Sequence, residues 1–133
     1  ARAAALGLEE DDVLWLGWRR DLPELYAALD GVALTSHDEG TPVALLEALA
    51  AGTPVAAREV GGVGEVLRDA AAGRLVPREA DAGTWARVLA REVEEAGPAG
   101  LPSTVRDAVA ERYSVERLAE DLTALYRREM EGP

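Results

Sequence analysis

One stretch of the chain, residues 34–57, constrains the fold and the chemistry more than any other. Its sequence is LTSHDEGTPVALLEALAAGTPVAA, and from Gly40 to Ala57 it contains a single charged residue, Glu47. The residues around Glu47 favour a helix and are apolar on every side, which is typical of a buried helix. A carboxylate in such a helix is costly unless a donor hydrogen-bonds to it. We therefore expect Glu47 either to meet a fixed protein donor or to face a cleft where a ligand supplies one.

The same stretch predicts a strand, a loop and a helix in that order. The strand is expected over residues 32–36, and the helix begins at Thr41 and Pro42, since proline suits the first helical turn. In an open parallel sheet such a loop lies at the carboxyl edge of the strands, where ligands bind. The free N–H groups and the positive dipole end of the helix then point at any anion bound there.

The rest of the chain continues this alternation. Further strands are predicted over residues 13–16, 54–57 and 74–76, short helices follow near residues 22–29 and 65–68, and longer helices are expected over 82–96, 103–113 and 114–130. The alternation indicates an α/β fold, a Rossmann-like parallel sheet with helices on both faces. The 133 residues are enough for one domain, 1–133, with a buried core.

Composition excludes several kinds of site. The formal net charge of −11 argues against a nucleic-acid partner held by its phosphates. The chain has no Cys, no Lys and one His, which rules out disulfides, a Walker A loop, a Schiff base and most metal cages. No run approaches the roughly eighteen uninterrupted apolar residues of a membrane span, and no signal peptide is visible. A cytoplasmic setting is the expectation.

Seven residues separate Glu39 from Glu47 in DEGTPVALLEALAAGTPV; LGWRRDLPELYAALDGVALTS precedes this block, and EVGGVGEV and AGRLVP follow it. These four blocks of sequence resemble the C-terminal domain of GT-B retaining glycosyltransferases of the group 1 family. The order and spacing of the blocks carry the resemblance, because two glutamates at this spacing arise often by chance. The resemblance implies that the chain binds a nucleoside-diphosphate hexose as donor, without a metal or other cofactor.

The resemblance assigns roles to both glutamates. Glu39 would be the catalytic residue, lying beside the transferred sugar and stabilising the positive charge that develops at the anomeric carbon during transfer with retention. Glu47 would accept hydrogen bonds from the ribose hydroxyls, which would explain a carboxylate in an apolar helix.

The loop between the glutamates would bind the donor through its backbone. Gly40, Thr41 and Val43 would offer N–H groups to sugar and phosphate oxygens. Pro42 lies in the same donor-binding stretch but has no N–H to donate.

Two further segments belong to the implied donor site. Gly17, Trp18 and Arg19 fall where the family brings the nucleobase to the sheet. Gly61 and Gly62 are candidates for a donor loop, although a tight turn between strand and helix explains them equally well.

The resemblance also implies parts that this sequence does not contain. The chain starts at Ala1 without an initiator Met, so we expect it to be a piece of a longer protein, truncated at its N-terminus. The family's Arg and Lys diphosphate clamp and its acceptor-binding N-terminal domain would precede Ala1. Without the clamp, nucleotides should bind weakly to this acidic chain. Any peripheral membrane contact is expected only through the missing domain.

The missing part would also affect the sheet. In the family strand order 3-2-1-4-5-6, the four predicted strands are numbers 3 to 6, which leaves a gap of two strands beside the strand at 32–36. An unpaired apolar edge favours association between chains, so self-association is expected.

Plainer interpretations stand beside these. Glu47 could cap a helix or pair with an Arg, and His37, the only His, is expected to be a loop residue because Ser36 and Asp38, its neighbours in sequence, cannot align with it as a triad. Trp15 is expected in the core and Trp85 on the inner face of its helix. We expect three arginines to lie on the solvated surface: Arg19, Arg20 and Arg58.

Two other functions remain open from the sequence. One is a non-catalytic interaction module on a Rossmann-like scaffold with a vestigial site. The other is a receiver-like signalling domain, which the missing Lys and the missing acidic cluster disfavour.

Overall fold

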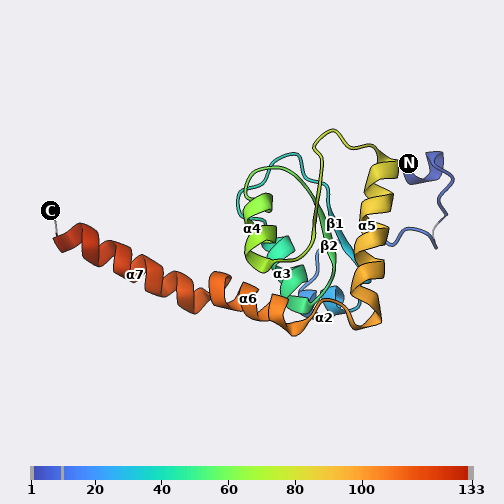
Figure 1. The fold of residues 1–133 in the computed structure, drawn as a ribbon. Helices are drawn as coiled ribbons and strands as arrows, with labels where there is room; N and C mark the ends of the chain where they lie inside the picture. The colour runs from blue at the N-terminus through green and yellow to red at the C-terminus, as the bar shows by residue number, and fades with distance from the viewer. Residues whose placement is uncertain (1, 10, 132–133) are drawn as a thin grey trace.

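A computed structural model describes residues 2–9 and 11–131 of the chain. Three parallel strands form the centre, and helices pack around them (Figure 1). In chain order the elements are α1 (Arg2–Ala5), α2 (Leu22–Ala27), β1 (Val32–Leu34), α3 (Val43–Ala51), β2 (Val55–Arg58), α4 (Val63–Ala70), β3 (Arg74–Val76), α5 (Ala82–Ala96), the 3₁₀ turn η1 (Gly97–Ala99), α6 (Ser103–Tyr113) and α7 (Val115–Glu131). The predicted α/β, Rossmann-like class is confirmed.

The sheet has the order β1-β2-β3, with both pairs parallel. Val32 pairs with Val55 on one side of β2, and Arg58 pairs with Val76 on the other. The central strand β2 is fully buried from Val55 to Ala57, as expected of a parallel strand that is covered on both faces. All three strands therefore end at the same edge, which brings the loops that follow β1 and β2 close together.

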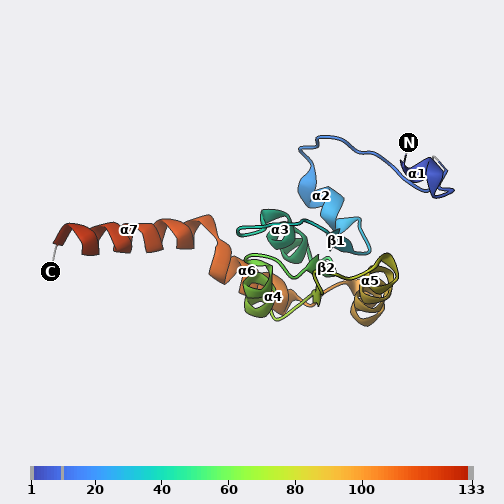
Figure 2. The same cartoon turned by 90° about the horizontal axis from the view of Figure 1, so that it is seen from above.

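Helices cover both faces of the sheet. Figure 2 shows α3, α4 and α6 on one side of the strands and α5 on the other. The core on the first side is built from apolar side chains of α3, α4, α6 and β2, including Leu45, Leu49, Val55, Val63, Val66 and Val109. Trp85 on α5 is half-buried. Within the described part of the chain, no helix is both long enough and apolar enough to cross a bilayer.

The predicted strand over residues 13–16 does not form. This segment has no regular structure, and Trp15, which was expected in the core, is 83% exposed. A strand needs a neighbour to pair its backbone N–H and C=O groups. Among residues 2–9 and 11–131 the sheet contains only β1, β2 and β3, and residues 13–16 pair with none of them.

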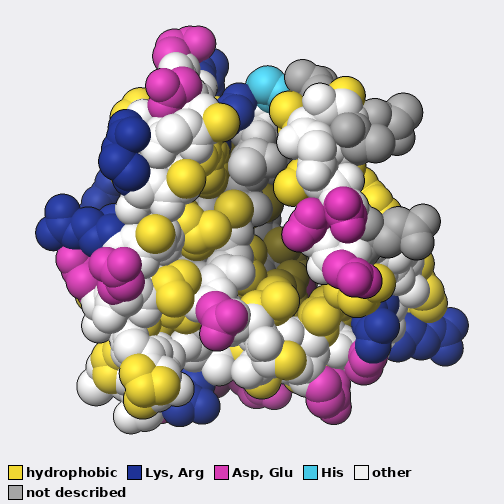
Figure 3. Space-filling model, turned by 90° about the vertical axis from the view of Figure 1, so that its right-hand side faces the viewer, with side chains coloured by type: hydrophobic (Ala, Val, Ile, Leu, Met, Phe, Trp, Pro, Cys, Tyr) yellow, Lys and Arg dark blue, Asp and Glu magenta, His cyan; other side chains and the backbone are white. Residues whose placement is uncertain are grey.

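The edge of β1 that faces away from β2 is unpaired within the described chain. Figure 3 shows apolar side chains gathered in a hollow on the side of the molecule that carries α5 and the N-terminal segment, with acidic side chains around it. This open edge agrees with the gap expected beside β1. Self-association through it stays a prediction.

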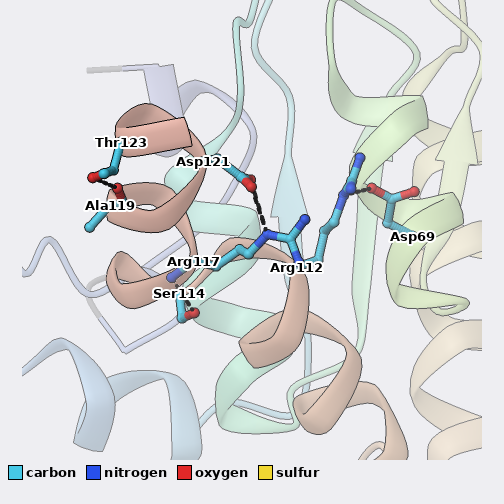
Figure 4. A network of polar contacts seen from close by, with 7 residues as sticks. All are labelled: Asp69, Arg112, Ser114, Arg117, Ala119, Asp121 and Thr123. Atoms are coloured by element: carbon cyan, nitrogen blue, oxygen red, sulfur yellow. Dashed lines mark hydrogen bonds and ion pairs between the residues drawn. The ribbon is translucent and has the colours of Figure 1, made fainter. Parts of the chain in front are cut away.

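Polar contacts link α4 to the end of α6 and stabilise the start of α7. Asp69 on α4 accepts hydrogen bonds from Arg112 Nε at 3.3 Å and from the Tyr113 hydroxyl at 2.8 Å. At the start of α7, the Arg117 backbone N–H donates to Ser114 Oγ at 3.2 Å, and its side chain pairs with Asp121 (Figure 4). These contacts fix the end of α6, from which α7 projects away from the rest of the molecule (Figure 1).

Candidate functional site

The loop from residue 35 to residue 42 joins the carboxyl end of β1 to α3. Pro42 is the N-cap of α3, and its carbonyl accepts hydrogen bonds from the N–H groups of Leu45 and Leu46. The first N–H groups of a helix have no acceptor within the helix, and no side chain caps α3. The N-terminus of α3, with Thr41 and Val43 exposed, is therefore open to an anion.

Two glycines of the turn after β2 pack directly against this loop. The Gly62 N–H donates to the Gly40 carbonyl oxygen at 3.1 Å. Gly61 has a φ of +46°, and a Cβ atom there would overlap the carbonyl oxygen of Glu39, while one on Gly62 would overlap that of Gly40. Backbone approach this close is possible only for glycine. The turn at Gly61 and Gly62 thus does more than connect β2 to α4. It also supports the loop that carries Glu39.

A second contact ties the two loops together. Arg58 Nη1, at the end of β2, lies 3.0 Å from Nδ1 of His37, two residues before Glu39. The arginine donates and the ring nitrogen accepts in the tautomer that leaves Nδ1 unprotonated. The Nε atom of Arg58 is buried and has no hydrogen-bond partner among the described residues. The sequence predicts Arg58 on the solvated surface and His37 in a loop, and it does not reveal their contact because 21 residues separate them.

Glu47 lies one helical turn beyond Val43 and lines a pocket between α2 and α3. The pocket has a volume of about 410 Å³ and is lined by Leu22, Pro23, Tyr26, Ala27, Glu47, Ala50, Ala51 and Arg106. Glu47 forms no salt bridge within the described chain, and its position inside α3 excludes a capping role. Glu47 therefore faces a cleft, which it shares with side chains of α2.

The Tyr26 side chain shares this pocket with Glu47. Burial raises the pKa of Tyr26 above its usual value, and the charge of Glu47 and hydrogen bonding to its carboxylate raise it further. Tyr26 therefore stays protonated and can act as a donor to Glu47. Nothing in the local sequence indicates a partner for the hydroxyl of Tyr26, so its place beside Glu47 in the pocket was not predicted.

The structure does not bring Gly17, Trp18 and Arg19 to the loop of Glu39. Trp18 is 79% exposed, and the central guanidinium carbon of Arg20 lies over its ring, 5.0 Å from the ring centre. Arg19 pairs with Asp21 through Nε and Oδ1 at 2.8 Å. In Figures 1 and 2 the segment before α2 runs apart from the loop that precedes α3. Their assignment to the nucleobase stays a prediction.

The described residues contain no group of three or more His, Cys, Asp or Glu side chains that could hold a metal ion. What the site offers is an open helix N-terminus, a carboxylate on a supported loop, Glu39, and a second carboxylate in a pocket, Glu47. Such a set suits a ligand with an anionic centre flanked by hydroxyl groups.

Comparison with known proteins agrees with this chemistry. A family model described as glycosyl transferases group 1 matches residues 1–95. D-inositol 3-phosphate glycosyltransferase from Salinispora tropica is 40% identical over 126 residues, which are 93% of this chain and 26% of the relative. The protein of the same name from Saccharomonospora viridis is 38% identical over 111 residues, 84% of this chain and 26% of the relative. The chain thus spans about a quarter of the length of these relatives.

Solved structures give the same result. Sucrose-phosphate synthase from Thermosynechococcus elongatus superposes with a TM-score of 0.85 at 28% identity, over 99% of this chain and 33% of the synthase. HepE from Anabaena, solved in complex with UDP-glucose, superposes with a TM-score of 0.77 at 30% identity, over 92% of this chain and 35% of HepE. The chain belongs to the group 1 glycosyl transferases, and its fold is that of the C-terminal domain of GT-B enzymes.

Proposed function

We propose that this chain is the nucleotide-sugar donor-binding part of a retaining glycosyltransferase, which transfers a hexose from a nucleoside diphosphate to an acceptor. The acceptor would be held by another part of a longer protein. Membership of the group 1 family supports the proposal, as does the likeness to a protein solved with UDP-glucose. The observation that carries it is the packing of Gly61 and Gly62 against the backbone of Glu39 and Gly40, beside the open N-terminus of α3.

The geometry of α3 suggests the order in which the donor lies. The diphosphate would meet the free N–H groups around Val43, where the positive end of the helix dipole favours an anion. Glu47 is four residues further along, about 6 Å at the rise of an α-helix, which is a suitable separation for the ribose that follows the diphosphate. Its carboxylate oxygens would accept hydrogen bonds from the ribose hydroxyls.

Glu39 would act on the transferred sugar. As the bond between the anomeric carbon and the diphosphate breaks, positive charge develops on the sugar and negative charge on the leaving oxygen. A carboxylate held on a rigid loop stabilises the former, and fixed backbone N–H groups stabilise the latter. This role requires a fixed position of Glu39, and the contacts of Gly61 and Gly62 with its loop supply one. In this proposal no metal takes part.

The strongly acidic character of the chain limits what it can do alone. With a formal net charge of −11, it repels a diphosphate at long range. We propose that basic residues outside this chain supply most of the charge that holds the diphosphate. UDP and GDP should accordingly bind the isolated chain weakly.

Kinetics of the full-length enzyme test these roles. Glu47→Ala should raise the KM for the donor about tenfold, the effect of losing one charge-assisted hydrogen bond, with a smaller change in kcat. Glu39→Ala should lower kcat by about a hundredfold or more, with a smaller change in KM. Glu94→Ala, which removes an exposed carboxylate from α5, is the matched control and should change neither. Equal and small effects of the first two variants would refute the assignment.

A further inference from the structure

Tyr26 and Glu47 reach the same pocket from different helices. Tyr26 comes from α2 and Glu47 from α3, and most of the other lining side chains are small or apolar. A half-buried carboxylate in apolar surroundings is costly unless a donor hydrogen-bonds to it. Two side chains with hydrogen-bond donors share the pocket with Glu47, those of Tyr26 and Arg106. Glu47 forms no salt bridge with Arg106 or with any other described residue, which leaves the phenolic hydroxyl of Tyr26 as the candidate donor.

Tyr26 is anchored to the helix that carries its partner. Its backbone carbonyl oxygen accepts a hydrogen bond of 2.7 Å from Thr53 Oγ1, just beyond the end of α3. Thr53 is only 3% exposed, and its own N–H donates to the carbonyl of Ala48 in α3 at 2.9 Å. The ring of Tyr26 also packs against the core cluster. These contacts hold α2 against α3, and with the two helices the side chains of Tyr26 and Glu47 that line the pocket.

We infer that Tyr26 is a positioning residue for Glu47, holding the carboxylate in the orientation that binds the nucleoside part of the donor. This inference rests on the proposed function, because it needs Glu47 to contact the donor. One carboxylate oxygen engaged by Tyr26 fixes the side-chain torsions and leaves the remaining lone pairs for ligand hydroxyls. Such preorganisation raises affinity, since the side chain does not have to be ordered when the ligand binds.

The test is a set of binding titrations on the full-length enzyme. Calorimetry with UDP and with GDP identifies the tighter nucleotide, which is then titrated into each variant. Tyr26→Phe keeps the ring and its packing but removes the hydroxyl, and should weaken the Kd roughly tenfold. Tyr113→Phe is the matched control, because it also removes a tyrosine hydroxyl that donates to a carboxylate, that of Asp69, outside the proposed site. Its Kd should equal that of the wild type.

A double-mutant cycle separates positioning from a general effect on the fold. If Tyr26 acts through Glu47, Tyr26→Phe should change the Kd less than about twofold in a protein that already carries Glu47→Ala. Thermal unfolding of each variant shows that it is folded at the temperature of the titration.

Three outcomes contradict the inference, and they can be told apart. If Glu47→Ala weakens binding and Tyr26→Phe does not, Tyr26 has no positioning role, while the proposed function stands. If both weaken binding and their effects add, Tyr26 acts independently of Glu47. If neither variant changes the Kd, Glu47 does not contact the nucleotide, and the proposed function fails at this residue.

Discussion

Two of the segments assigned to the donor site are held very differently in the structure. The loop carrying Glu39 is held by the turn at Gly61 and Gly62 through backbone contacts that leave no room for a side chain. The segment carrying Gly17 and Trp18 has no regular structure and is exposed. The first depends on neighbours within three adjacent elements, β1, β2 and α3. The second lacks a neighbouring strand in the described chain, so its sequence motif alone does not determine its place.

The largest expected effect concerns the supported loop. Gly61→Ala would force a Cβ into the carbonyl oxygen of Glu39 and would also place a side chain at positive φ. We expect it to lower the free energy of unfolding by about 3 kcal/mol and to abolish most of the transfer activity. Urea unfolding of the full-length enzyme measures the change in stability, and its turnover rate measures the loss of activity.

A second glycine in the following helix is the control for this change. A Cβ on Gly64 would meet Leu75 Cδ1 at 3.8 Å, an ordinary contact. Gly64→Ala should therefore be neutral or stabilise by up to about 1 kcal/mol through helix propensity. Wild-type stability and turnover in Gly61→Ala would show that the two loops are not held as the structure indicates.

The next effect is expected in the exposed segment, and it should differ between the isolated chain and the full-length enzyme. In the isolated chain, Trp15→Ala should change the free energy of unfolding by less than about 0.5 kcal/mol, because the side chain is 83% exposed. In the full-length enzyme, where we expect residues 13–16 to pair with further strands, it should cost about 3 kcal/mol. Denaturant titration of both proteins tests this. Equal effects in the two proteins would show that the segment does not gain a neighbour.

The smallest effect concerns a local ion pair of that segment. Hydrogen bonding to Arg19 lowers the pKa of Asp21, so the pair stabilises the fold above the ordinary pKa of an aspartate and this contribution is lost as the pH falls through the lowered value. Asp21→Asn should thus destabilise the protein slightly at pH 7 and not at about pH 2. Unfolding curves at both pH values provide the comparison, and a larger effect in acid would contradict the assigned sign.

Sequence predicted the parts of the site that depend on local pattern. The strand, loop and helix around Glu47 follow from proline, glycine and apolar periodicity, and the structure forms them with a pocket at Glu47. The support of Glu39 by Gly61 was not predictable, because a double glycine is compatible with an ordinary turn. Trp15 was placed wrongly, since an apolar run predicts burial only where another surface covers it.

Contacts between residues distant in sequence were missed altogether. Arg58 and His37 are 21 residues apart, as are Tyr26 and Glu47, and neither pair has a recognisable local pattern. Both contacts result from the order of the strands and helices in space. A single sequence identifies the elements that carry a site more readily than it identifies the side chains that hold the site in shape.

Hydrogen exchange of the full-length enzyme, followed by mass spectrometry with and without UDP-glucose, tests the central claim most directly. The claim is that the donor binds at the loop between β1 and α3, supported by the turn after β2. We predict that the donor slows exchange in peptides covering residues 39–47 and 60–63, and leaves α7 unchanged. Slower exchange elsewhere, with residues 39–47 unaffected at a donor concentration that saturates the enzyme, would contradict the account.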